Sequence, residues 1–76
     1  MKIPLLSAKE LIKILEKLGF FEIRQRGSHK ILKHSDGRII IVPVHKGRKI
    51  GRGLLRKIIN DIEIDRKKFL ELWRDL

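Results

Sequence analysis

The chain has 76 residues, no cysteine, and 19 basic against 9 acidic side chains, which gives a formal net charge of +10. This length has room for one domain, spanning residues 1–76, because short chains bury a small share of their unfolded surface. The lack of cysteine excludes disulfides and thiolate metal sites, and it makes the reducing cytoplasm the default location. The N-terminus lacks a long apolar run, and the longest apolar stretch, 39–44, is too short to span a membrane, so we expect a soluble protein without a cleavable signal.

The positive charge is confined to the middle of the chain. Residues 24–57 hold eleven basic residues and one acidic residue, Asp36, whereas basic and acidic residues balance elsewhere. Such a concentrated field attracts polyanions, because each neutralised phosphate releases counterions. Nucleic acid is therefore the leading partner class, ahead of an anionic membrane surface or an acidic protein.

The first predicted element is a helix over residues 8–18. Ser7 and Glu10 form the sequence pattern of a capping box, in which each side chain bonds the other residue's backbone N–H. Apolar residues recur at helical spacing as far as Leu18, and Gly19 supplies a left-handed stop.

Three strands are expected next, in an antiparallel meander. The first runs from residue 20 and is broken at Gly27, with Phe21 and Ile23 on one side and Glu22 and Arg24 on the other. A second strand, 29–34, leads through an Asp-Gly turn signal at 36–37 to a third, 39–42, which Pro43 ends. One face of such a sheet must be buried.

The remaining residues predict a loop and two helices. The loop, 44–53, carries three glycines and four basic side chains, and an apolar helical stripe follows over 54–62. Asp65 can cap a final short helix. The expected fold is therefore α+β, in the order α-β-β-β-α with a short C-terminal helix, with the helices on one face of the sheet and a ligand on the other.

His29 is the strongest candidate for chemistry. It opens the second strand among several cations, and imidazole exchanges a proton near neutral pH. Neighbouring cations favour its neutral, basic form, whereas a bound phosphate favours the charged, acidic form. Both forms suit RNA transesterification, with His45, Lys30 and Ser28 as candidates for a second acid or base.

The other motifs indicate binding or structure. His34 is interpreted as a polar group beside the turn, and it should project to the opposite face from His29, so a histidine metal site is not expected. The loop lacks the Gly-Lys-Ser/Thr ending of a P-loop, which excludes a nucleotide cofactor but leaves contact with a phosphate backbone. Aromatic residues are too few for a base-stacking platform.

The chain resembles the HicA toxins, small mRNA interferases of bacterial and archaeal toxin-antitoxin pairs. The resemblance runs from about residue 6 to 70 and rests on Leu18-Gly19-Phe20, Arg24-Gln25-Arg26-Gly27-Ser28-His29, Asp36-Gly37-Arg38, Val42-Pro43-Val44-His45, and Gly53 with Leu55, Arg56 and Ile58. It implies a fold like that of double-stranded-RNA-binding domains, RNA cleavage without a metal or cofactor, a catalytic role for His29, and inhibition by a HicB antitoxin that covers the active face. Leu54 departs from the family pattern, which usually has threonine at this place.

Three functional hypotheses follow. The first is a ribonuclease toxin in which His29 moves the proton and mRNA is held by Arg24, Arg26, Ser28, Lys30, Arg38, His45, Lys46, Arg48, Lys49 and Arg52. The second is a non-catalytic module that binds duplex RNA by its shape. The third is a protein-binding role, in which the basic face contacts an acidic antitoxin.

Overall fold

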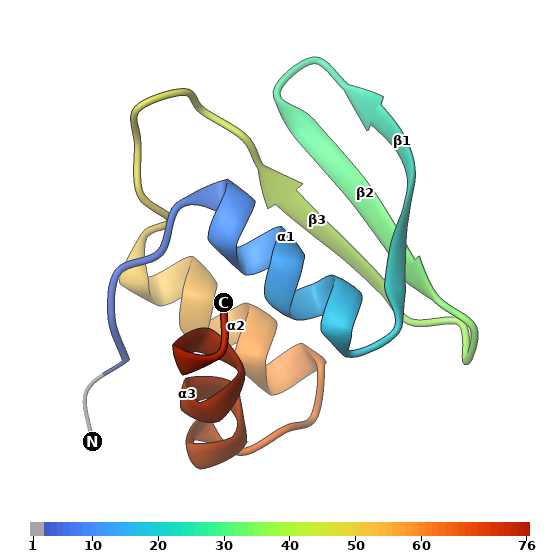
Figure 1. Ribbon diagram of the computed structural model, residues 1–76. Coiled ribbons are helices and arrows are strands. Elements are labelled where there is room, and N and C mark those ends of the chain that lie inside the picture. Colours follow the sequence, from blue (N-terminus) through green and yellow to red (C-terminus); the bar gives the residue numbers. More distant parts are fainter. Residues whose placement is uncertain (1–2) are drawn as a thin grey trace.

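The computed structural model describes residues 3–76 and contains three helices and a three-stranded sheet (Figure 1). The elements are α1 (Ala8–Lys17), β1 (Phe20–Arg26), β2 (His29–His34), β3 (Ile39–Pro43), α2 (Arg52–Asp61) and α3 (Arg66–Arg74). The strands pair antiparallel in the order β1-β2-β3. This arrangement confirms the predicted α+β fold, and the main difference in bounds is that α2 begins two residues earlier than its apolar stripe.

The helix caps are those that the sequence predicts. The Glu10 backbone N–H donates to the Ser7 hydroxyl at 3.2 Å, and the Ser7 N–H donates to the Glu10 carboxylate at 3.0 Å. This bond from Ser7 holds the pKa of the Glu10 carboxyl below its usual value. The Asp65 carboxylate accepts the Lys68 N–H at 2.7 Å, and Gly19 ends α1 with a φ of +96°. Local hydrogen bonds therefore cap the first turns of α1 and α3.

The core lies between one face of the sheet and the helices. It consists of apolar side chains alone, because no polar or charged residue within 3–76 is buried. The apolar face of α1 packs against the sheet and against α3. Helix α2 adds Leu55, Ile58 and Ile59 to the core cluster. The fully buried side chains are Leu6, Leu11, Ile14, Leu15, Leu32, Val42, Leu55, Ile62 and Phe69. None of the helices in these residues is long and apolar enough to cross a lipid bilayer.

An irregularity in β1 changes which side chains share a face. Glu22 pairs with Leu32 but Arg24 pairs with Ile31, so Ile23 is an extra residue on β1. Because directly paired residues lie on the same face, Arg24 joins Phe21 on the face away from the helices. The prediction that Arg24 lies on the same side as Glu22 was wrong, since strict alternation does not anticipate a bulge.

The open face of the sheet carries large apolar side chains. Phe21, Ile23, Ile39 and Ile41 are each between 47% and 55% exposed. We call these four residues the apolar stripe. The helices cover only the other face, so the stripe lies in solvent beside the cations of the same strands. An exposed apolar area of this kind is typical of a binding surface.

The joint between α2 and α3 contains an unfavourable backbone conformation. Glu63 follows the C-cap of α2 with a φ of +58°, and it is the one non-glycine residue within 3–76 with a positive φ. The left-handed conformation crowds the Cβ atom of an L-residue against its carbonyl oxygen, whereas glycine adopts it without this cost.

Replacing Glu63 by glycine should stabilise the fold. We expect Glu63→Gly to raise the free energy of unfolding by about 0.5–1 kcal/mol, because relief of the left-handed strain exceeds the added entropy of glycine in the unfolded chain. Urea denaturation followed by circular dichroism measures this change. Glu71→Gly, at an exposed position within α3, should instead destabilise by a similar amount. Equal destabilisation by both substitutions would contradict this account of the joint.

Candidate nucleic-acid interface

His29 lies at the start of β2, directly after a two-residue turn. Gly27 has a φ of +56° as the first residue of that turn, and the Gln25 amide donates to the Gly27 carbonyl at 2.9 Å. Across the sheet His29 pairs with Arg26 on one side and with Pro43 on the other. Its side chain is exposed, and among residues 3–76 it makes no hydrogen bond or ion pair. The imidazole is therefore free to contact a ligand.

A hollow of about 330 Å³ opens beside His29, between β3 and α2. Its apolar lining comes mainly from isoleucines of β3, with Leu54 and Ile58 of α2. Two charged residues of α2, Lys57 and Asp61, complete the lining. His29 thus stands at a concave site of a size that accommodates part of a nucleotide chain.

Three cations share the open face with His29. Arg26 pairs directly with His29, Arg24 pairs with Ile31, and Lys33 pairs with Phe21. All three side chains are exposed. Lys33 was missing from the predicted RNA-binding residues, although its position four residues after His29 places it on the same face of the strand.

The basic loop lines a second, larger hollow on the helix side of the sheet. This hollow has a volume of about 750 Å³ and lies between α1, β2 and residues 44–49. Its cationic lining consists of Lys9, Lys13, Lys30, Lys46, Arg48 and Lys49, together with His45. Lys9 and Lys13 were not among the predicted residues, because α1 mixes three lysines with two glutamates and so showed no marked excess of positive charge in the sequence.

Lys30 and His45 line a different hollow from His29. Adjacent residues of a strand project to opposite faces, and the Lys30 amine forms an ion pair with Glu22 at 3.3 Å on the helix side. His45 follows β3 and also lines the larger hollow. The Ser28 carbonyl accepts the Val44 N–H at 2.6 Å, which ties the loop to the turn that carries His29. The two hollows are therefore neighbours at this end of the sheet.

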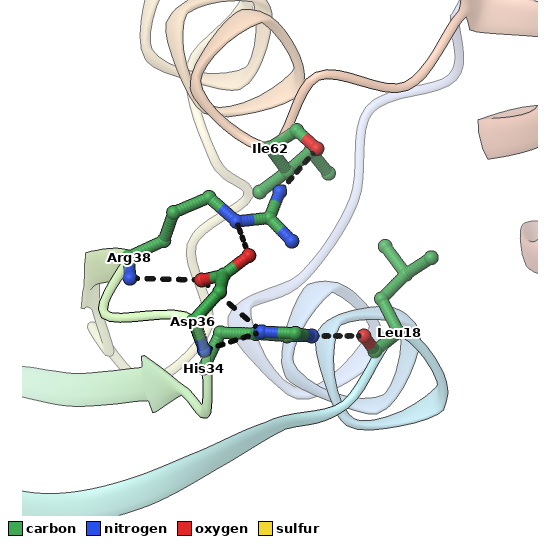
Figure 2. A network of polar contacts seen from close by, with 5 residues as sticks. All are labelled: Leu18, His34, Asp36, Arg38 and Ile62. Carbon is green, nitrogen blue, oxygen red and sulfur yellow. Dashed lines mark hydrogen bonds and ion pairs between the residues drawn. The ribbon is translucent and has the colours of Figure 1, made fainter.

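Arg38 belongs to a network at the opposite end of β3 (Figure 2). Its guanidinium donates to Asp36 at 2.8 Å and to the Ile62 carbonyl at 2.6 Å, and it lies 5.3 Å from the centre of the Phe20 ring. The Arg38 backbone N–H donates to Asp36 at 3.0 Å and holds the pKa of that carboxyl below its usual value. The guanidinium thus joins the β2–β3 turn to the end of α2.

His34 belongs to the same network. Its Nδ1 accepts the Asp36 N–H at 3.1 Å, and its Nε2 donates to the Leu18 carbonyl at 3.1 Å (Figure 2). A Cβ atom at Gly19 would lie 2.9 Å from that Nε2, so glycine is required there both by its φ and by the close approach of the ring. The interpretation of His34 as a polar group beside the turn is confirmed.

Arg52 and Leu54 lie at the start of α2. The Arg52 guanidinium donates to the Ile3 carbonyl at 3.0 Å, which ties the N-terminal segment to the helix. Leu54 packs against the core, so a residue that departs from the expected threonine contributes apolar area instead of a hydroxyl. Arg52 thus has an intramolecular partner before any ligand binds.

The histidines do not gather in one place. His29 and His34 lie on opposite faces of β2, as expected from their spacing of five residues. Across residues 3–76, no group of three or more histidine, aspartate or glutamate side chains is arranged to hold a metal ion.

Comparison with protein families gives a match that covers most of the fold. The family model described as the HicA toxin of bacterial toxin-antitoxin systems matches residues 8–64. This chain belongs to the HicA toxin family. Comparison with curated proteins gives no match. The matched segment runs from α1 to the end of α2 and includes His29, the open face, the hollow beside His29 and all lining residues of the larger hollow except Ser7, whereas α3 lies outside it.

Membership in the HicA family assigns the chain to the toxin half of a bacterial toxin-antitoxin system. The family match confirms the HicA resemblance that the Gly-Ser-His and Pro-x-His segments indicate. Within the HicA fold the two segments meet, since His29 pairs with Pro43 across β2 and β3.

Arg38 should matter more for stability than the other arginines of this surface. We expect Arg38→Ala to lower the free energy of unfolding by about 1–2 kcal/mol, because the Ile62 carbonyl and Asp36 lose charged hydrogen bonds. Arg24→Ala removes an exposed guanidinium of the same charge and should change stability by less than about 0.5 kcal/mol. Urea denaturation of both variants at the same salt concentration makes the comparison. Equal effects would show that the network adds nothing to the fold.

Proposed function

We propose that this HicA-family protein is an endoribonuclease that cleaves mRNA, with His29 as a general acid or base. The observation that carries the proposal is the placement of an exposed, unbonded imidazole at the edge of a hollow, on a face that also presents Arg24, Arg26 and Lys33. A free imidazole among cations suits proton transfer next to a phosphodiester.

The proposed reaction is a transesterification within the RNA chain. The ribose 2′-oxygen attacks the adjacent phosphorus, the bond from phosphorus to the 5′-oxygen breaks, and a 2′,3′-cyclic phosphate forms. One proton leaves the 2′-hydroxyl and one is added to the departing 5′-oxygen, so the step needs no oxidant, reductant or cofactor. His29 supplies one of these transfers, and neighbouring cations hold the phosphates.

The RNA backbone is proposed to extend from the open face towards the basic loop. Arg24 and Arg26 contact phosphates beside His29, and Ser28 lies at the turn between the two hollows. The larger hollow then holds the continuing strand through Lys30, His45, Lys46, Arg48 and Lys49. Arg38 and Arg52 already bond backbone carbonyls, so we assign them to the fold more than to RNA.

Replacing His29 tests the chemistry directly. His29→Ala should abolish cleavage of labelled RNA while changing the free energy of unfolding by less than about 0.5 kcal/mol, because the exposed imidazole has no partner in the fold. Gel analysis of the products, in the presence of EDTA, measures cleavage, and Lys67→Ala, at an exposed position of α3 outside both hollows, is the control that should cleave at the wild-type rate. An RNA with a 2′-deoxyribose at the cleaved position should bind but stay intact.

Three outcomes would contradict this proposal. Cleavage by His29→Ala at the wild-type rate would remove the histidine from the mechanism. Loss of all cleavage in EDTA, restored by a divalent ion, would show that a metal is needed. Salt-sensitive binding of RNA by the wild-type protein, without any product, would favour the non-catalytic RNA-binding module instead.

The antitoxin is proposed to be a HicB-type protein that covers the open face. The apolar stripe gives such a partner a surface to bury, and the cations around it attract acidic side chains. His29 would be enclosed by the same contact, which explains how binding of the partner stops cleavage.

The apolar stripe separates antitoxin binding from catalysis. The double substitution Phe21→Ser and Ile23→Thr should weaken binding of a HicB-type antitoxin at least about tenfold, since buried aromatic and aliphatic groups dominate such interfaces. RNA cleavage should be retained, because neither side chain lines the hollow beside His29. Titration calorimetry measures the affinity, and unchanged inhibition of this variant would place the antitoxin elsewhere.

A further inference from the structure

The hollow beside His29 contains a cation of the basic segment 24–57 that was not among the predicted RNA-binding residues. Lys57 lies on α2 and lines this hollow together with His29. It belongs to a different element from the cations of the strands, so it approaches the site from the opposite wall. A substrate in the hollow would therefore lie between an imidazole on the sheet and an ammonium on the helix.

The relative direction of α2 and β3 orders the charged residues along the hollow. The hydrogen bond from Arg38 to the Ile62 carbonyl holds the end of α2 beside the beginning of β3. His29 pairs with Pro43 at the other end of β3, so α2 and β3 run in opposite directions (Figure 1). Lys57 precedes Asp61 by one helical turn, and it therefore lies on the His29 side of that carboxylate.

Lys57 has no competing partner in the fold. Among residues 3–76, its amine forms no hydrogen bond or ion pair, and its side chain is exposed. Asp61 repels phosphate from the far end of the hollow, which leaves the His29 end for the substrate. The floor of Ile40, Leu54 and Ile58 is apolar, so no other side chain there competes with Lys57 for a phosphate.

The chemistry leaves a role for such a cation. In the proposed transesterification, negative charge builds up on the two non-bridging oxygens of the phosphorus as the 2′-oxygen attacks. An imidazole that transfers a proton cannot also neutralise this charge, whereas an ammonium offers three donors and a full positive charge. Donors aimed at developing charge are usually among the largest contributions to catalysis.

We propose that Lys57 is a second catalytic residue, which binds a non-bridging oxygen of the scissile phosphate across the hollow from His29. This inference rests on the proposed ribonuclease function and adds to it a residue that stabilises the transition state. Lys57 would therefore bind the phosphate more tightly in the transition state than in the RNA before reaction.

The test compares lysines of equal charge at two sites. Lys57→Gln should lower kcat for RNA cleavage about tenfold to a hundredfold with a small change in KM, because one transition-state contact is lost among many phosphate contacts. Lys67→Gln, on the exposed face of α3 outside both hollows, removes the same charge and should stay within about twofold of wild type. Lys57→Arg keeps the positive charge and should recover most of the lost rate. Thermal melting of each variant confirms that the fold is intact.

The outcomes separate this inference from the function on which it rests. If His29→Ala abolishes cleavage but Lys57→Gln has the same kcat as Lys67→Gln, Lys57 has no catalytic role. A rise in KM with unchanged kcat would make Lys57 an ordinary phosphate contact and would also overturn the inference. If His29→Ala still cleaves RNA, the proposed function itself fails, whatever Lys57 does.

Discussion

The structure depends on the burial of one face of a three-stranded sheet beneath α1. Leu11, Ile14 and Leu15 of the helix are fully buried and share a cluster with Leu32 and Val42 of the sheet. A chain of 76 residues provides enough apolar helix surface to cover one face of the sheet. The helices cover the face that carries Leu32 and Val42. The second face of the sheet is left to solvent as a consequence of size, and that face presents His29.

The placement of the charged side chains also follows from the separation of a buried apolar core from an exposed surface. Because no charged side chain within the described residues is buried, every cation is available at the surface, either for internal bonds or for a ligand. Arg38 and Arg52 are engaged with the carbonyls of Ile62 and Ile3, where they join elements that are distant in the chain. Lys49 forms a longer ion pair with Glu10 of α1, at 3.8 Å. Within the described residues, no side-chain hydrogen bond or ion pair engages Arg24, Arg26, Lys46 or Arg48. The basic residues thus have two uses, since some join elements of the fold and others remain exposed for a ligand.

Much of this fold was predictable from the sequence because its signals are local. Capping by Ser7 and Asp65, the stop at Gly19 and the positions of the helices and strands each depend on a few adjacent residues, and these are confirmed. The bulge at Ile23 was not predictable, since it depends on how β1 pairs with β2. At the site, the exposed position of His29 followed from the strand pattern. The approach of Lys57 depends on the packing of α2 along β3, which no short segment encodes.

The apolar stripe also determines how the isolated toxin behaves in solution. Copies of the chain repel one another through a net charge of +10, and this repulsion keeps their exposed isoleucine and phenylalanine side chains apart. Salt shortens the range of that repulsion to about 10 Å at 0.1 M and about 3 Å at 1 M, while hydrophobic attraction persists. Concentrated salt therefore brings the protein closer to aggregation, so its colloidal stability in the free state is greatest in dilute buffer.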